Sequence, residues 1–316
     1  KESIDLASYR LGIGEETLWK FPSLVVEPGR RLVLFASGHD RWQSGDYHVP
    51  FRLGAKGELL RLVGPSMEEQ RVEIPKLPAD VSYGVKERSL LAEPTPGDEN
   101  AAAIGSPPLK PTFSRERGFV SSPFPLIMIA STPQTVIRYT VDGSAPSETN
   151  GQLYRGPIQV NQTTVVRAVC LMPDCLPSRV TTASYLFPQD ILTPYQDIPE
   201  GWPPARLING QRLVYGMEAP MNIGATHDEF SKALVSVPTV SLVMDLDDLL
   251  DEHTGIYTHA VERGRDWERS VSMEWIDPRD NASSSKQTDA GLRIRGGYSR
   301  SRRAPKHGFR VIARSA

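Results

Sequence analysis

The chain has 316 residues, of which 39% are hydrophobic and 23% charged, and its formal net charge is −2. These proportions are those of an ordinary globular protein, and the length exceeds one typical core, so we expect two or three domains. No window of about 18 apolar residues occurs, which argues against a membrane-spanning segment. The first residues also lack the pattern of a signal peptide.

Turn-forming residues punctuate the whole sequence. The 27 prolines and 25 glycines separate short runs of β-branched residues. This pattern is typical of all-β modules joined by turns, so we predict a mainly β protein. The net charge says little about partners, because it averages an acidic body and a basic C-terminal segment.

The first predicted domain covers residues 1–96. Strand-like runs occur at Leu18–Phe21, Arg31–Ala36, Leu59–Val63 and Arg71–Ile74. The phrases LWKFPSLVVEPGRRLVLFASG, FRLGAKGELLRLV, DVSYG and EPTPGDEN, in this order, resemble a lamin-tail-type domain of bacterial surface proteins. The resemblance implies an immunoglobulin-like β-sandwich whose N-terminal strands are missing, and such a sandwich would have a bare edge.

A stretch rich in proline, glycine and alanine, residues 97–110, is predicted to be a linker. The second predicted domain follows at residues 111–187. In it Ile137, Tyr139 and Val141 alternate with polar residues and lead into Asp142-Gly143, a strong hairpin turn signal. The phrase IRYTVDGSAPS, followed by LYRGPIQV and TVVRAV, resembles the small immunoglobulin-like domain at the C-terminus of chitobiases and hexosaminidases. The resemblance implies a second β-sandwich.

The name of that family suggests a glycosidase, but the residues do not support catalysis. Glycoside hydrolysis needs two carboxyl groups held about 5–9 Å apart in a cleft. The acids of this domain, Asp142, Glu148 and Asp174, all stand in turn contexts. We therefore interpret the second domain as a spacer.

The two cysteines, Cys170 and Cys175, flank a Met-Pro-Asp turn. They either form a disulfide that closes a small loop or remain free thiols, and spacing alone does not decide between these alternatives. With no histidine nearby, the pair cannot complete a structural zinc site.

Residues 188–236 form a proline-rich connector, in which we predict a helix at residues 228–235 capped by Asp228. The third predicted domain covers residues 237–316. Its strand-like runs lie at Thr239–Met244, Ser270–Ile276, Asp289–Arg295 and Gly308–Ile312, and a short helix is expected at Asp247–Leu250. The phrases GIY, GRDWERSVSMEWI, GLRIRGGYSR and PKHGFRV resemble the N-terminal part of the CotH-type kinase family. The resemblance implies the incomplete start of an α+β domain.

The end of the chain is its most basic part. Between Gly291 and Ala316 there are eight lysines and arginines and no acid, and the rest of the chain holds 28 basic and 38 acidic residues. Cations that alternate with apolar residues in this way suggest strands that present charge to an anion.

The resemblance to CotH-type kinases implies that this anion is nucleotide phosphate. It places Arg293, Arg295 and Lys306 toward phosphate, with Ser299 as a hydrogen-bond donor. For Arg300, Arg302 and Arg303 we predict a solvated face instead.

Catalysis by this chain is not expected. In the family the metal-binding and base carboxylates lie downstream of the PKHGFRV-like segment, where this sequence ends. ATP and Mg²⁺ are therefore cofactors only of a complete kinase domain, and none is expected for this chain. The acids Asp245, Asp247, Asp248 and Asp251 do not follow the EF-hand pattern, and we interpret them as an acidic helix start.

These observations predict a non-catalytic fragment of a large secreted or cell-surface bacterial multidomain protein, whose β-sandwiches act as spacer or adhesion modules. The main alternative is the N-terminal portion of a secreted CotH-type kinase that uses ATP and Mg²⁺. A second alternative is a carbohydrate-binding module with Trp42 or Tyr154 as exposed aromatics. Partners at the cell surface would be proteins or glycans, and nucleic acid is disfavoured because the body is acidic.

Overall fold

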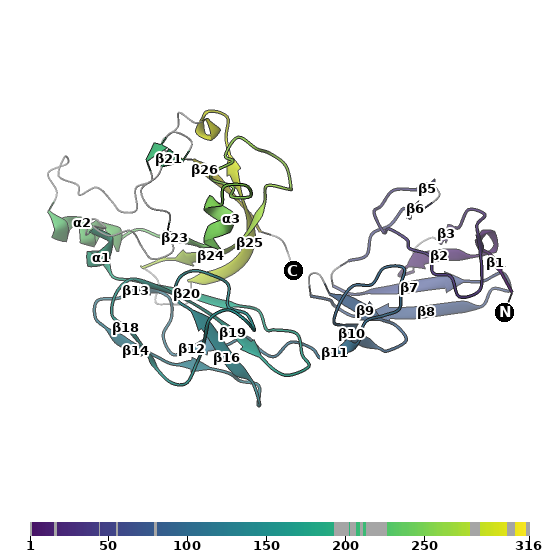
Figure 1. Cartoon of the computed structure of the whole chain (residues 1–316), viewed down its shortest axis with the longest axis horizontal. Coiled ribbons are helices and arrows are strands. Elements are labelled where there is room, and N and C mark those ends of the chain that lie inside the picture. The colour runs from purple at the N-terminus through teal and green to yellow at the C-terminus, as the bar shows by residue number, and fades with distance from the viewer. Residues whose placement is uncertain are drawn as a thin grey trace. The chain divides into compact units, whose positions relative to one another are not determined.

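The protein is mainly β and divides into two compact units, residues Lys1–Ser106 and Pro107–Ser315 (Figure 1). The computed structural model describes residues 2–15, 18–43, 45–54, 56–78, 81–192, 202, 207–208, 211–212, 226–278, 285–301 and 307–313. Within these ranges no helix has the length and apolar character needed to cross a membrane. The boundary between the units lies inside the stretch predicted as a linker.

The first unit contains several small antiparallel sheets. The largest has the order β3-β2-β7-β8, and a second has the order β11-β10-β9. The strands are β1 (Ile4–Asp5), β2 (Arg10–Ile13), β3 (Trp19–Lys20), β4 (Val25–Val26), β5 (Arg41–Gln43), β6 (Asp46–His48), β7 (Glu58–Val63), β8 (Glu69–Ile74), β9 (Ser82–Gly84), β10 (Ser89–Leu91) and β11 (Ala103–Ile104). A 3₁₀ turn, η1 (Leu6–Ser8), separates β1 from β2.

An aromatic cluster forms the core of this unit. Leu11, Phe21 and Val49 are buried, and Trp19 and Trp42 pack against them with ring centroids 5.6 Å apart. Aromatic side chains therefore fill this core, and Trp42 is one of them.

Three features of the first unit differ from the prediction. Residues 31–36 form no strand, and only Phe35 makes an isolated bridge, to His48. Leu34 and Ala36 nevertheless pack against the core, so their alternation reflects burial without a ladder of hydrogen bonds. Arg10–Ile13, which was not predicted, is an inner strand between β3 and β7. Finally, β11 lies within the predicted linker and pairs with β10.

The first half of the second unit is built from nine strands around one apolar core. They are β12 (Thr112–Phe113), β13 (Gly118–Phe119), β14 (Phe124–Leu126), β15 (Met128–Ile129), β16 (Val136–Thr140), β17 (Gln152–Leu153), β18 (Ile158–Val160), β19 (Thr164–Leu171) and β20 (Thr181–Leu186). A five-stranded sheet of order β13-β20-β19-β16-β17 shares its core with the pairs β14-β18 and β12-β15.

Residues two apart on these strands point to the same side and fill that core. Val166, Ala168 and Cys170 of β19 and Ala183 and Tyr185 of β20 are all buried in it. Asp142 follows β16, and its carboxylate accepts hydrogen bonds from the Ser144 amide (2.9 Å) and hydroxyl (2.7 Å). This Asx-type turn confirms that Asp142 serves turn geometry.

The connector carries short elements: α1 (Pro188–Leu192), β21 (Leu207–Ile208), β22 (Gln211–Arg212) and α2 (His227–Leu234). The helix α2 was predicted, but its cap was assigned to the wrong residue. Thr226 is the N-cap and forms a capping box with Glu229, while Asp228 lies in the first turn and pairs with Lys232. Thr-x-x-Glu satisfies two free amides reciprocally, which an aspartate inside the helix cannot do.

The last part of the second unit is a four-stranded antiparallel sheet of order β23-β24-β25-β26. Its elements are β23 (Thr239–Val243), α3 (Leu246–Leu250), β24 (Arg269–Ile276), β25 (Lys286–Arg295), the 3₁₀ turn η2 (Tyr298–Arg300) and β26 (Gly308–Ala313). All four strands and the short helix were predicted. We call this structure the C-terminal sheet.

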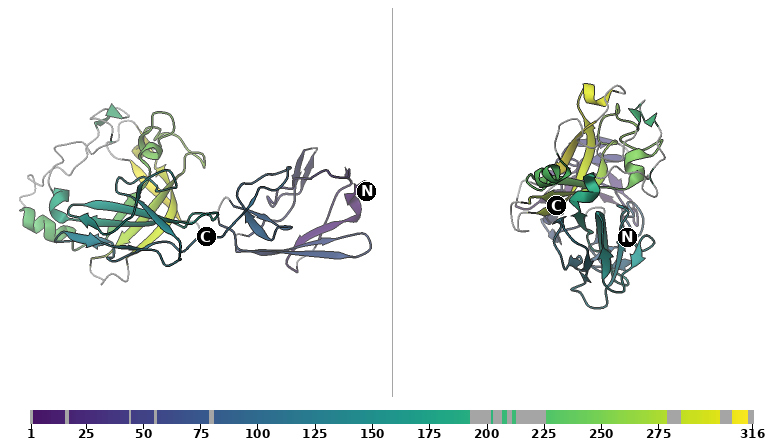
Figure 2. Two further views of the ribbon diagram at one scale, coloured as in Figure 1. Left: turned by 60° about the horizontal axis from the view of Figure 1, so that its bottom comes forward. Right: turned by 90° about the vertical axis from the view of Figure 1, so that its left-hand side faces the viewer.

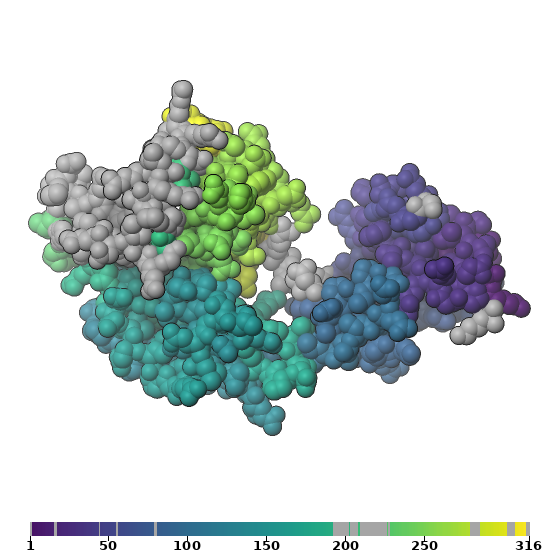
Figure 3. Space-filling view, in the orientation of Figure 1, coloured from purple at the N-terminus to yellow at the C-terminus, as the bar shows by residue number. Residues whose placement is uncertain are grey.

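The C-terminal sheet is covered differently on its two faces. Val271, Leu292 and Ile294 on one face pack with Ile256 and Ala260 of the loop after α3. The other face lies against β20, whose backbone amides donate to side chains of β24 and β25. Figures 2 and 3 show the C-terminal sheet, in green and yellow, against the teal strands of the first half of this unit. The two halves of the second unit are thus in direct contact.

Candidate functional site: the basic C-terminal segment

The basic segment is a hairpin-like structure made by β25, η2 and β26. In it Arg293 lies opposite Arg310, and Arg295 lies opposite Gly308. Gly296 has a positive φ of 114°, and a Cβ atom there would come within 2.0 Å of the Ser299 hydroxyl. The turn therefore requires glycine at this position both for backbone conformation and for space.

Arg293, predicted to face phosphate, is instead paired within the protein. Its Nε donates to Glu268 Oε2 at 2.6 Å, and its Nη2 contacts the same oxygen. The side chains are only 22% and 11% exposed, so the pair is shielded from solvent. Glu268 lies over Gly291, where a Cβ atom would stand 2.2 Å from the glutamate Oε1. Gly291 thus leaves room for the carboxylate that neutralises Arg293.

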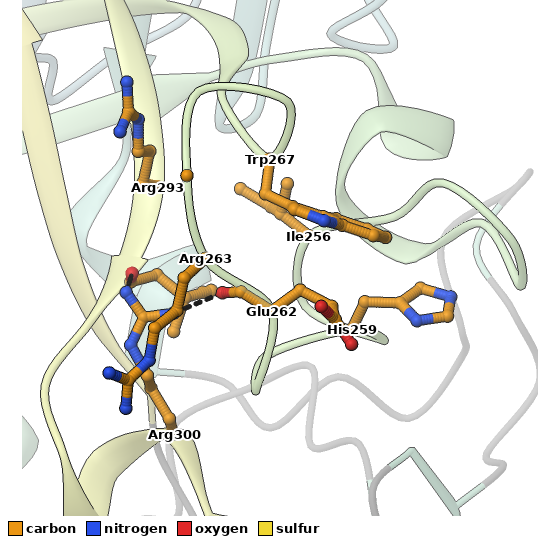
Figure 4. A pocket seen from close by; sticks show the side chains of 9 residues that line it. Ile256, His259, Glu262, Arg263, Trp267, Arg293 and Arg300 are labelled. Atoms are coloured by element: carbon orange, nitrogen blue, oxygen red, sulfur yellow. Dashed lines mark hydrogen bonds between the residues drawn. The ribbon is translucent and has the colours of Figure 1, made fainter.

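Arg300 also serves the protein's own backbone. Its Nη1 donates to the carbonyl oxygens of Ala260 (3.3 Å) and Glu262 (2.5 Å), and its Nη2 donates to that of Ile294 (Figure 4). Burial lowers the pKa of Arg300, and the nearby charge of Arg263 lowers it further. Arg300 is therefore a cross-link between β25 and the loop after α3, and the prediction of a solvated position was wrong.

Two arginines of the segment remain available. Arg295 and Arg310 are exposed, and within the described parts of the chain neither has a carboxylate partner. Residues two apart on a strand share a face, and Arg310 lies opposite Arg293, so all three arginines point to one side of the sheet. Arg293 is already neutralised by Glu268, so Arg295 and Arg310 are the charges on this side that could meet an anion.

Ser299 and Lys306 complete the predicted set. The Ser299 hydroxyl donates to the Arg295 carbonyl at 2.7 Å, and its own carbonyl accepts from His307 Nδ1 at 2.5 Å. Ser299 is thus engaged in holding the turn. Lys306, together with Arg302 and Arg303, lies outside the described residues.

The pocket beside these arginines is very small (Figure 4). It is lined by Ile256, His259, Glu262, Arg263, Gly264, Trp267, Arg293, Ile294 and Arg300 and has a volume of about 10 Å³. That volume holds about one water molecule, which is too little for a phosphate group. An anion on this segment would therefore bind at the surface, beside Arg295 and Arg310.

A larger hollow lies elsewhere in the second unit. It has a volume of about 440 Å³ and is lined by Arg115, Glu116, Arg117, Gly118, Phe119, Val235, Ile276, Asp277, Pro278 and Ser285. Its size is that of a small-molecule site. Its charged groups have both signs, however, so it presents no net field to an anion.

The acidic residues around α3 do not converge on one point. Asp245 accepts a hydrogen bond from the Ala145 amide (2.7 Å) and Asp248 lies 3.5 Å from Arg269. Burial raises the pKa of Asp248. Asp251 caps its own loop, and hydrogen bonds from the amides of His253 and Thr254 lower its pKa to about 2. Among the described residues, no group of three or more His, Cys, Asp or Glu side chains could hold a metal ion.

The two cysteines are free thiols. Cys170 lies in the apolar core, fully buried, and burial raises its pKa to about 11. Cys175 is partly exposed at the turn. The disulfide considered from the sequence is therefore not formed, because the strand alternation of β19 turns the Cys170 side chain into the core.

The aromatic candidates for a carbohydrate site are used internally. Trp42 packs against Trp19, Phe21 and Tyr47. The Tyr154 hydroxyl accepts a hydrogen bond from the Met128 amide at 3.1 Å. Both residues are half-buried, so their contacts within the protein account for them without a sugar.

Two buried glutamates were missed by the sequence reasoning. Glu268 neutralises Arg293, and Glu274 is completely buried against β20. A signal for Glu274 exists in the run RSVSMEWI, where Ser270, Ser272 and Glu274 alternate with apolar residues. Such alternation is typical of a strand whose polar face is exposed to solvent. Here the polar face of β24 is instead covered by the sheet that contains β20.

Comparison with known proteins gives one match. The Fn3 associated family matches residues 127–185, from the end of β14 to β20. No curated protein and no solved structure matches the chain. The match covers a minor part of the sequence, and this β-rich part is similar to the Fn3 associated family. We call residues 111–187, the half of the second unit that contains the match, the Fn3-associated module.

Proposed function

We propose that this chain is a non-catalytic spacer or adhesion segment of a large secreted or cell-surface bacterial multidomain protein. One observation carries the proposal. In the basic segment, which is the best candidate for an anion-binding site, two arginines bind groups of the protein itself. Arg293 is neutralised by Glu268, and Arg300 is bound by three carbonyl groups. A phosphate-transfer site needs such cations free for the substrate.

The β-rich Fn3-associated module agrees with this role. Its single core and its turn-forming acids provide structure without a paired-carboxylate cleft. We assign residues 111–187 to a chitobiase-C-like immunoglobulin-like sandwich and residues 1–96 to a lamin-tail-like domain. The support is the order of the sequence phrases together with the aromatic core of the first unit. Partners of such modules at a cell surface would be proteins or glycans.

A second candidate is favoured by a specific observation. Arg295 and Arg310 share one face of the C-terminal sheet without a carboxylate partner among the described residues. In the N-terminal part of a secreted CotH-type kinase this face would meet the phosphates of ATP with Mg²⁺. Its support is that the four strands of the C-terminal sheet lie at the sequence runs that carry this resemblance.

Titration calorimetry of the whole chain with ATP and Mg²⁺ separates the two candidates. The spacer function predicts no saturable binding up to about 1 mM nucleotide. A dissociation constant of that size corresponds to a binding free energy of about −4 kcal/mol. Saturable binding that is lost in an Arg295→Gln/Arg310→Gln variant would overturn it in favour of the second candidate. Arg30→Gln/Arg71→Gln, which replaces two exposed arginines of the first unit, is the matched control for net charge.

A further inference from the structure

The contact between the Fn3-associated module and the C-terminal sheet contains a layer of polar side chains. Thr182 and Ser184 of β20 face Ser241, Ser272, Glu274 and Gln287 of the sheet, and Arg117 lies beside them. We call these seven residues the polar layer. Glu274, Ser184 and Thr182 have no exposed surface, and Ser272 is 2% exposed.

Glu274 is the centre of the polar layer. Its Oε1 accepts from the Ser184 amide at 3.1 Å, and its Oε2 accepts from the Ser184 hydroxyl at 2.5 Å. Arg117 Nη1 stands 3.2 Å from Oε1. Every donor to this buried carboxylate thus comes from the Fn3-associated module, across the contact.

Two further links cross the same contact. The Thr182 amide donates to Gln287 Oε1 at 3.0 Å, and Gln287 Nε2 donates back to the Val180 carbonyl at 3.1 Å. The Ala145 amide donates to Asp245 at 2.7 Å. Three backbone amides of the module therefore depend on side chains of the segment that contains the C-terminal sheet.

The polar layer is incompletely satisfied. Buried atoms without a hydrogen-bond partner include Arg117 Nε and Nη1, Thr182 Oγ1, Ser272 Oγ and, at its margin, Arg167 Nε. Arg117 Nη1 is close to Glu274 but poorly aligned for a hydrogen bond. Each such group would regain water if the contact opened, and a buried ion pair is costly to keep dry.

We propose that the Fn3-associated module and the C-terminal sheet form a reversible contact, which opens along the polar layer while both partners stay folded. Each partner has its own apolar core, so separation exposes the polar layer together with two buried apolar side chains, Val243 and Ile276, which lie beside Gly143 and Gly118 of the module. Glu274 is the positioning residue, because its carboxylate accepts two hydrogen bonds from Ser184 and lies beside the Arg117 charge of the module. Opening would release the outer face of β20 and the arginine-bearing face of the sheet together.

Hydrogen exchange of assigned amides in the whole chain tests the proposal. The amides of Ala145, Thr182 and Ser184 report opening directly, since their acceptors lie across the contact. The Cys170 amide is the internal reference, because it donates to Ser178 within the module. We expect the three reporters to share one opening constant, at least about tenfold larger than that of Cys170.

The variant Glu274→Gln sharpens the test. Removing the charge weakens both bonds to Ser184 and leaves Arg117 without a counter-charge, so all three reporters should open about tenfold or more as often, with Cys170 unchanged. Glu268→Gln, which breaks the ion pair with Arg293 on the same sheet, should leave the three reporters unchanged.

If Glu274→Gln fails to fold, Gln287→Ala replaces it, because it removes one crossing link without leaving a charge. It should raise all three opening constants by a few fold. Reporters as slow as Cys170 in the unaltered chain would overturn the proposal and make the second unit one rigid body. A response confined to the altered residue's own hydrogen-bond partner would overturn it equally.

Discussion

The strand β20 is buried on both faces, and the two faces are built by opposite rules. Ala183 and Tyr185 point into the apolar core of the Fn3-associated module, where the Tyr185 and Phe124 rings meet edge to face at 5.1 Å. Thr182 and Ser184, one residue along, point into the polar layer. Equal burial therefore conceals two different kinds of contact.

The difference separates stability from orientation. Apolar contacts are non-directional and contribute free energy in proportion to the area buried. A buried carboxylate contributes little net stability, but it tolerates only the arrangement that brings its donors together. On this basis the inner face of β20 stabilises the module, and the outer face determines how the C-terminal sheet is placed on it.

The largest effect should come from the inner face. Tyr185→Ala removes a fully buried ring and should lower the free energy of unfolding of the second unit by about 4 kcal/mol. Tyr185→Phe should cost only about 1 kcal/mol, since it removes the hydrogen bond to the Arg115 carbonyl (2.8 Å) and keeps the ring. Denaturant unfolding followed by fluorescence measures both. Equal losses in the two variants would show that the hydroxyl, rather than the core, dominates.

On the outer face, the stability of the contact should depend on Arg117 and Glu274 as a pair. Glu274→Ala leaves Arg117 buried without a counter-charge and should cost about 3 kcal/mol. The double variant Arg117→Met/Glu274→Leu replaces the whole pair by apolar groups and should restore most of that loss. A double variant as unstable as Glu274→Ala would mean that the pair stabilises the contact outright, and that the two faces of β20 differ less than we argue.

Sequence reasoning predicted the parts of the fold that depend on local patterns. The strands of the C-terminal sheet and the turn at Asp142 follow from alternation and turn chemistry. Residues 31–36 also alternate, but whether such a run joins a ladder depends on a neighbour that the local sequence does not specify. The helix α2 was found, while its cap depended on reading Thr226 and Glu229 as a pair.

The candidate site was less predictable, because its arginines bind partners that are far away in the sequence. Whether Arg293 is free depends on Glu268, and Arg300 depends on carbonyl groups about 40 residues earlier. A pattern of cations on strands identifies the side chains that could bind an anion. Which of them remain available is decided by tertiary contacts, and among the cations of the segment that the structure describes Arg295 and Arg310 are left.

Alkaline pH tests the apolar core that the inner face of β20 shares with β19. Burial raises the pKa of Cys170 from 9.0 to about 11, and it raises that of Tyr185 as well. Both groups are neutral in the folded state, so their contribution is complete below the unfolded pKa and is lost as pH rises through the folded one. We expect about 2 kcal/mol of stability to be lost between pH 9 and pH 11. Thermal melts of Cys170→Ala should show a shallower loss over this window, and an unchanged slope would contradict the assignment.

The smallest effects should distinguish the two opposed arginines of β25 and β26. Arg293→Gln removes the shielded pair with Glu268 and should cost about 1 kcal/mol. Arg310→Gln removes only an exposed cation from a like-charged cross-strand position, so stability should change by less than about 0.5 kcal/mol or rise slightly. Chemical denaturation at low and at 0.5 M salt measures both, since screening should abolish any gain from Arg310→Gln while a shielded pair is less sensitive. A loss of about 1 kcal/mol in Arg310→Gln would show that this arginine is already bound to the protein, and would leave Arg295 as the one available arginine of β25 and β26.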